Sequence, residues 1–173
     1  RRSKKLEVAS LHCVKTHTSD YYSLIEMVRV EAFNSLPSFI ECLPEGWGLN
    51  WKIIIRGKLN DERFDINLQN VIEGPSDDED TPLHVSVRPG CEEIVCNAYE
   101  GGYGWGPEER QLGCAIQTGA DFEVEVTVKP NAFGVWINGS HHADFTHRQP
   151  WEALRYVAVV GNVELEYLSA EQI

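Results

Sequence analysis

Apolar and polar residues alternate along most of the chain after residue 35, and this pattern predicts β-strands. Residues 64–69 read Phe-Asp-Ile-Asn-Leu-Gln, and residues 122–128 alternate apolar residues with Glu and Thr. Successive side chains of a strand point to opposite faces, so each segment has one core face and one polar face. A dense apolar run at 51–56 predicts a further strand.

Turn residues separate these segments at regular intervals. The turns are predicted at Asn60-Asp61-Glu62, Pro130-Asn131, Asn138-Gly139 and Gly161-Asn162. Asn-Gly favours the tight two-residue turn of a β-hairpin. About ten short strands with little helical pattern indicate an all-β, antiparallel β-sandwich. We assign it to residues 36–170.

Residues 1–35 lie outside this pattern and form an N-terminal extension. Apolar residues recur at helical spacing between Ser19 and Asn34, whereas Val28-Arg29-Val30-Glu31 fits a strand equally well. The extension could mask a sheet edge, form an oligomer contact, link to another domain or simply pack on the sandwich.

Polar side chains gather in the segment 83–111. Strand alternation puts His84, Ser86 and Arg88 on one face, and Val95 and Asn97 on one face of the returning strand. A glycine-rich turn then leads to Trp105, and Glu108 and Arg110 follow with the spacing of a common face. If the three strands are neighbours, the polar residues converge around the tryptophan ring: His84, Ser86, Arg88, Asn97, Glu108 and Arg110.

An exposed indole beside fixed hydrogen-bonding groups suits a sugar. The C–H patch of a galactose ring, exposed because the 4-hydroxyl is axial, can stack on Trp105. Arg88 and Arg110 provide forks of donors, His84 a donor or an acceptor, and Asn97 and Glu108 acceptors. A phosphate site would have more cations, and an apolar ligand would meet fewer charges.

These residues resemble the galectins, whose signature is a His-x-Asn-x-Arg strand, a Val-x-Asn strand and a Trp-x-x-Glu-x-Arg segment. The chain has His84-x-Ser86-x-Arg88, Val95-x-Asn97 and Trp105-x-x-Glu108-x-Arg110. Several motifs in the same order are far more specific than any one alone. The resemblance extends over roughly residues 36–170 and implies a jelly-roll-like sandwich with the ligand on its concave face.

The resemblance also implies a function for each residue in binding β-galactosides of the lactose or N-acetyllactosamine type. Trp105 would stack on the sugar, and His84, Ser86 and Arg88 would test the axial 4-hydroxyl. Asn97 and Glu108 would hold the 6-hydroxyl, and Arg88, Glu108 and Arg110 would reach the neighbouring sugar. Ser86 departs from the family asparagine, so it leaves a shorter donor and acceptor at that position.

The sequence leaves three candidate functions. The first is a non-enzymatic galactoside-binding lectin. The second is a glycosidase, which needs two carboxylates about 5–10 Å apart; around Trp105 the sequence offers Glu108 alone, placed between arginines that would keep it ionised. The third is a galectin-like protein with weakened or altered sugar specificity, owing to Ser86, that acts through protein-protein contacts.

The composition of the chain limits the classes of partner that we expect it to bind. The net charge of −12 disfavours nucleic acid and anionic membrane surfaces. No apolar run approaches the length of a spanning helix, and the broken apolar stretch after the basic N-terminus does not read as a signal peptide. The expected partners are therefore galactose-containing glycans on glycoproteins or glycolipids, and the sequence leaves homodimerisation open.

The cysteines and the possible metal ligands lack the spacing of disulfide-linked or metal-binding motifs. The five cysteines include no Cys-x-x-Cys pair, which favours reduced thiols over disulfides. Galectins are made in the cytosol and exported by a non-classical route, so the resemblance implies cytoplasmic and extracellular locations. The acidic loop 74–80 lacks the spacing of an EF-hand, and His141, His142 and His147 lack the geometry of a zinc site. We expect no metal and no cofactor.

Overall fold

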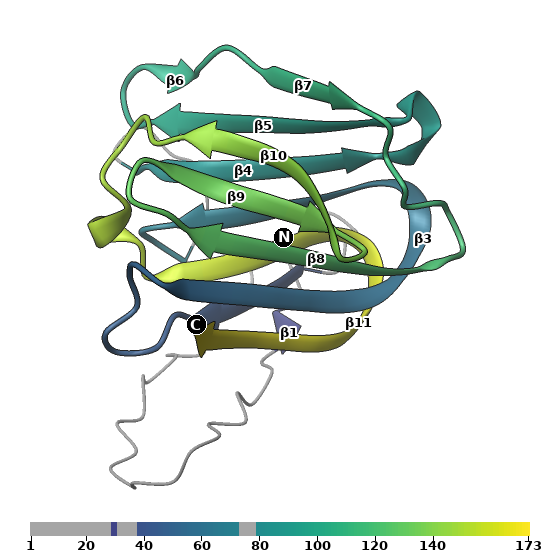
Figure 1. Cartoon of the computed structure of the whole chain (residues 1–173), viewed down its shortest axis with the longest axis horizontal. Helices are drawn as coiled ribbons and strands as arrows, with labels where there is room; N and C mark the ends of the chain where they lie inside the picture. The colour runs from purple at the N-terminus through teal and green to yellow at the C-terminus, as the bar shows by residue number, and fades with distance from the viewer. Residues whose placement is uncertain (1–28, 31–37, 73–78) are drawn as a thin grey trace, which may run out of the picture.

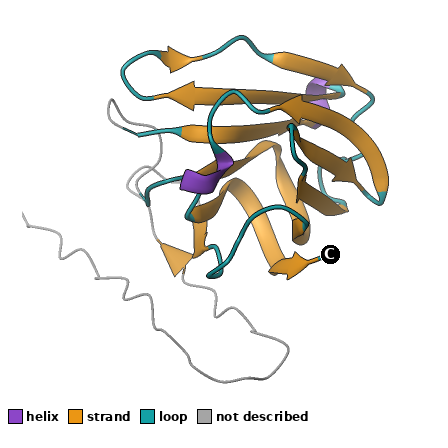
Figure 2. Ribbon diagram, turned by 60° about the vertical axis from the view of Figure 1, so that its left-hand side comes forward, coloured by secondary structure: helices purple, strands orange, loops and turns teal. Residues whose placement is uncertain are grey.

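The computed structural model describes residues 29–30, 38–72 and 79–173. Their regular secondary structure consists of strands and two short 3-10 helices, η1 (Pro89–Cys91) and η2 (Trp151–Ala153) (Figure 2). The strands are β1 (Arg29–Val30), β2 (Ser38–Cys42), β3 (Trp51–Gln69), β4 (Thr81–Arg88), β5 (Glu93–Glu100), β6 (Gly104–Trp105), β7 (Glu109–Leu112), β8 (Asp121–Val128), β9 (Ala132–Ile137), β10 (Ser140–Thr146) and β11 (Tyr156–Gln172). The predicted all-β class is confirmed.

The strands form two layers that share two long, curved strands. One layer has the order β1-β2-β11-β3-β4-β5, with β6 and β7 both paired to β5. The other layer contains β10, β9 and β8, and β8 pairs with the first half of β3. Each recorded pairing is antiparallel. Figure 1 shows β8, β9 and β10 lying across β3, β4 and β5, which gives the predicted antiparallel sandwich.

The bends of β3 and β11 correct two predicted turns. Residues 60–62 and 161–162 were expected to separate strands, but both strands continue through these positions. Asn162 alone lies between the pairs Gly161–Phe64 and Val163–Leu59, so residues 60–63 bulge out of β3. Gly161 has φ +134°, and a Cβ there would lie 2.8 Å from the Cβ of Phe64. The turn-forming residues therefore let one strand pass from one layer to the other.

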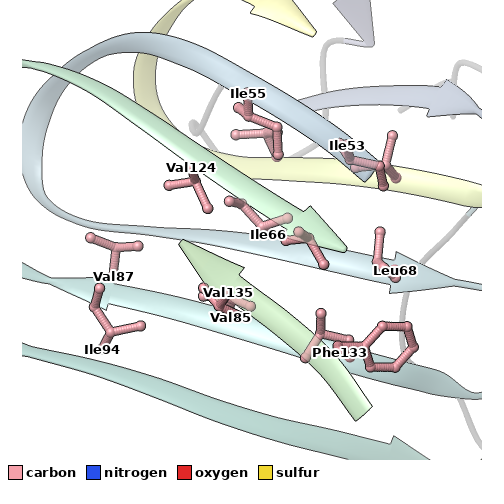
Figure 3. Close-up of a cluster of buried hydrophobic side chains, with 14 of the residues drawn as sticks. Ile53, Ile55, Ile66, Leu68, Val85, Val87, Ile94, Val124, Phe133 and Val135 are labelled. Atoms are coloured by element: carbon pink, nitrogen blue, oxygen red, sulfur yellow. The ribbon is translucent and has the colours of Figure 1, made fainter. Parts of the chain in front are cut away.

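The core lies between the layers, as the alternation predicted. Figure 3 shows Val85 and Val87 of β4 and Ile94 of β5 facing residues of the opposite layer, such as Val124 and Val135. All five are fully buried. Because these inward residues fix the register of β4 and β5, the alternate residues of both strands must point to the outer, concave face.

Other predicted elements have mixed outcomes. Asn138 and Gly139 adopt φ +48° and +77°, as the predicted β9–β10 hairpin requires. Arg29–Val30 pairs with β2 as a strand, so the helical interpretation is wrong for these two residues. The rest of the 1–35 extension, and residues 74–78 of the acidic loop, lie outside the described residues. None of the helical turns in the described part has the length or apolar character needed to cross a bilayer.

Candidate functional site

Strand register brings the predicted polar residues onto one face. His84 of β4 lies opposite Asn97 of β5, and Ser86 lies opposite Val95. Val95 in turn lies opposite Arg110 of β7. Directly opposed residues of antiparallel strands point to the same side of the sheet. The expectation that these three strands are neighbours is therefore correct.

Trp105 lies at the edge of this face with its ring half exposed. Trp105 directly follows Gly104, whose φ of +90° is a backbone conformation that favours glycine. The indole is 48% exposed. Its centroid lies 4.7 Å from that of His84 and 5.3 Å from that of Tyr99, which meets it edge-on. Two neighbouring rings thus hold the indole, and its exposed part is available for stacking on a sugar.

His84 is buried beneath the indole and held by a hydrogen bond. Its Nδ1 lies 2.6 Å from Oδ1 of Asn67 on β3. That oxygen can only accept, so Nδ1 carries the proton and Nε2 is left as an acceptor. Burial lowers the pKa of His84 below its ordinary 6.5. The imidazole is therefore neutral at pH 7 and presents a lone pair to the concave face.

Two arginines and two carboxylates form one network on the same face of the sheet. Arg88 donates to Glu93 at 3.3 Å and to Glu108 at 3.1 Å. Arg110 donates to the same two carboxylates. The hydrogen bond from Arg88, aided by that from Arg110, lowers the pKa of Glu108. The network keeps Glu108 ionised and fixes both guanidinium forks in one orientation. Glu93 is buried and was missed by the sequence analysis.

Ser86 and Val95 lie on the expected face but are fully buried. The Ser86 Oγ accepts a hydrogen bond of 3.0 Å from Nε of Arg88. Arg88 therefore covers the hydroxyl in this structure, whereas the sequence predicted that Ser86 would contact the ligand directly. Val95 packs beneath the site and supports it.

The amide of Asn97 is held in one orientation by its surroundings. Its Oδ1 accepts from the backbone N–H of Ala98 at 2.8 Å and from Nη1 of Arg148 at 3.0 Å. Its Nδ2 donates to the carbonyl of Gly106 at 2.9 Å. One Nδ2–H remains, so Asn97 offers a donor to a ligand where the sequence predicted an acceptor.

Arg148 ties this amide to the other layer. It follows β10, donates to Glu109 at 2.7 Å, and lies over the ring of Phe145 at 4.6 Å. A Cβ on Gly106 would come within 2.7 Å of its Nη1. These contacts give Arg148 a structural role, because they hold Asn97 and β7 to the end of β10.

Strand β3 adds residues that the sequence analysis did not assign to the site. Asp65 lies opposite Ser86, and Asn67 lies opposite His84. Their common face was visible in the alternation of residues 64–69. What the sequence does not give is that β3 runs beside β4, because strand pairing depends on the whole fold.

The metal and cysteine candidates lie apart from this face. His147 Nε2 bonds to the carbonyl of Lys129, and His141 Nε2 lies 2.9 Å from Asp144. Within the described residues no group of three His, Cys, Asp or Glu side chains is arranged to hold a metal ion. Cys91, Cys96 and Cys114 are free thiols.

Comparison with known proteins agrees with this architecture. Residues 38–170 match the galactoside-binding lectin family. Human galectin-7 is 35% identical over 126 residues, covering 72% of this chain and 90% of galectin-7. The 32 kDa beta-galactoside-binding lectin of Caenorhabditis elegans is 31% identical over 118 residues, covering 67% of this chain and 41% of that protein. Among solved structures, a human galectin-16 variant covers 76% of this chain and 94% of its own, with a TM-score of 0.67 and 23% identity. The chain is a member of the galactoside-binding lectin family, the galectins.

Proposed function

We propose that the protein is a lectin that binds β-galactosides on glycoproteins or glycolipids, and that it catalyses no reaction. The observation that carries the proposal is the half-exposed Trp105 ring, which packs against His84 on the same face of the sheet as the network of Arg88, Glu93, Glu108 and Arg110. The ring would stack on the C–H patch of galactose. The network would supply donors and an acceptor whose positions do not change on binding.

The hydroxyl contacts follow from the hydrogen-bonding capacity that each side chain has left. The axial 4-hydroxyl would donate to Nε2 of His84 and accept from Arg88. The 6-hydroxyl would accept the free Nδ2–H of Asn97 and donate to Glu108. Arg110, more than half exposed at the rim, would reach the next sugar. Glucose has an equatorial 4-hydroxyl and would leave the His84 and Arg88 groups unpaired.

A hydrolytic role has less support. A glycosidase needs one carboxyl group that donates a proton. Glu108 has a lowered pKa and two arginine partners, and Glu93 shares the same arginines. These carboxylates are suited to orienting donors and accepting hydrogen bonds. Binding is therefore the function that we propose.

Calorimetric titration with lactose tests this proposal. We expect millimolar to micromolar affinity, because a shallow wet site engages few ligand atoms. Trp105→Ala should abolish binding. Tyr167→Ala is the matched control, because this aromatic residue lies on the part of β11 that pairs with Arg56, in the other layer. Loss of binding in both variants, or in neither, would refute stacking on Trp105.

The burial of Ser86 favours a second candidate with altered specificity. With this hydroxyl covered by Arg88, the protein would select different galactosides from relatives that have asparagine there, and protein contacts could carry part of its activity. A glycan array with Trp105→Ala as control separates the candidates, since binding that survives this substitution does not use the sugar site. We further propose cytoplasmic and extracellular locations, to be tested by cell fractionation.

A further inference from the structure

The carboxylate of Asp65 lies on the concave face beside Ser86, whose buried hydroxyl is covered by Arg88. Asp65 lies directly opposite Ser86 in the pairing of β3 with β4. Its side chain is 18% exposed. Oδ1 accepts a 2.9 Å hydrogen bond from Nε of Arg63 and lies 3.8 Å from Nε2 of His84. Among the described residues we find no donor to Oδ2.

The groups beside Asp65 on β4 have no acceptor left for a second sugar hydroxyl. Ser86 is fully buried and its Oγ already accepts from Arg88. Arg88 can only donate, and the one lone pair of His84 Nε2 is needed by the 4-hydroxyl. A second sugar hydroxyl on this side therefore finds no acceptor on β4. Asp65 on β3 is the adjacent group that can accept.

The order of the strands matches the order of the hydroxyls around the ring. Asn97 lies on β5, His84 and Arg88 lie on β4, and Asp65 lies on β3, with β4 in the middle. On galactose the 4-hydroxyl lies between the 6-hydroxyl arm and the 3-hydroxyl. A ring with its 6-hydroxyl at Asn97 and its 4-hydroxyl at His84 therefore directs its 3-hydroxyl towards Asp65.

We propose that Asp65 is a specificity-determining residue that accepts a hydrogen bond from the 3-hydroxyl of galactose. This inference rests on the proposed function. Because an ionised carboxylate only accepts, the preferred ligand class is β-galactosides with a free 3-hydroxyl. Arg63 holds Oδ1, whereas Oδ2 has no donor among the described residues, so this oxygen would accept from the sugar.

A double-mutant cycle between protein and ligand tests the contact. Methyl β-lactoside and its analogue lacking the 3-hydroxyl of the galactose ring are titrated into wild type and Asp65→Ala. Wild type should bind the deoxy analogue about tenfold more weakly, which corresponds to ~1.4 kcal/mol for a charge-assisted hydrogen bond. Asp65→Ala should bind the lactoside about tenfold more weakly than wild type does, and should bind both ligands equally.

Two further variants make the result specific. Asp65→Asn keeps an acceptor oxygen without the charge, so its discrimination should be about threefold, between those of wild type and Asp65→Ala. Asp144→Ala is the matched control, because Asp144 pairs with Lys129 and His141 on β10, away from the site. It should behave as wild type. Thermal melts of all variants establish that they are folded.

The outcomes separate this inference from the proposed function. If wild type and Asp65→Ala prefer the lactoside over the deoxy analogue by the same factor, Asp65 does not contact the 3-hydroxyl and the inference is wrong. The same conclusion follows if wild type does not discriminate between the ligands. If folded wild type binds neither ligand at the highest concentration used, the proposed function fails and this inference fails with it.

Discussion

Arg148→Ala should destabilise the sugar site, although Arg148 makes none of the proposed sugar contacts. Its Nη1 hydrogen bond to the buried amide of Asn97 comes from a charged donor, a type that contributes about 1.5–3 kcal/mol. Its pair with Glu109 has side chains 24% and 44% exposed, so solvent limits it to about 1 kcal/mol. The free energy of unfolding should therefore fall by about 2–4 kcal/mol.

The same substitution should weaken lactose binding. Without Arg148, Asn97 keeps its bonds to Ala98 and Gly106 but loses the one that ties it to the other layer. Its free Nδ2–H is then less well placed, and the loss of part of a neutral hydrogen bond corresponds to about three- to tenfold in affinity. Arg148→Lys can replace one of the two hydrogen bonds and should recover part of both effects.

Urea unfolding and calorimetry in one buffer measure both quantities. Arg56→Ala is the matched control, because Arg56 also pairs with a glutamate and lies over an aromatic ring, but in the other layer. It should leave the lactose affinity unchanged. If Arg148→Ala loses stability while its affinity equals that of wild type, Arg148 is a structural residue alone, and the positioning argument is refuted.

Three more predictions concern pH, the strand bend and the serine. Because burial lowers the folded pKa of His84 below its ordinary 6.5, the unfolded chain takes up the proton first as pH falls, and the free energy of unfolding should decrease below about pH 6.5; urea unfolding that shows no such decrease between pH 7.5 and 5 would contradict this. Lactose affinity should fall only at the lower pH at which the folded imidazole itself takes up a proton at Nε2. Gly161→Ala should destabilise by ~1–3 kcal/mol in urea unfolding, whereas Gly90→Ala, with open space around it, should not; equal effects would exclude strain at the bend. Ser86→Asn should tighten or broaden galactoside binding, and unchanged titrations would mean that Ser86 is not the limiting position.

The face of each site residue could be predicted from the sequence because it depends on local alternation. Val85 and Val87 point into the core, so His84, Ser86 and Arg88 must point away from it. The exposure of Trp105 could be predicted from the glycine-rich turn that precedes it. These predictions needed no knowledge of which strands are neighbours.

The remaining parts of the site depend on pairing and on side-chain conformations. Asp65 and Asn67 join the site because β3 lies beside β4, and Arg148 joins it from the opposite layer. Such contacts link residues far apart in sequence, so no local pattern contains them. Ser86 is covered because the Arg88 side chain turns back over it, which strand alternation does not determine.

The bend of the long strands could be predicted only in part. Turn residues occur at 60–62 and 161–162, and the chain does change direction there. However, both strands keep their pairing through the bulge, because each belongs to the two layers at once. A turn and a strongly bulged strand have similar local composition.

A comparison of two disaccharides measures whether this site recognises the axial 4-hydroxyl of galactose. Lactose and cellobiose differ only in the configuration at carbon 4 of the terminal ring, so both should be titrated calorimetrically into the same wild-type protein. We expect saturable binding of lactose and affinity at least about tenfold weaker for cellobiose, since His84 and Arg88 would lose a shared hydroxyl. Equal affinity for the two sugars, or tighter binding of cellobiose, would contradict it.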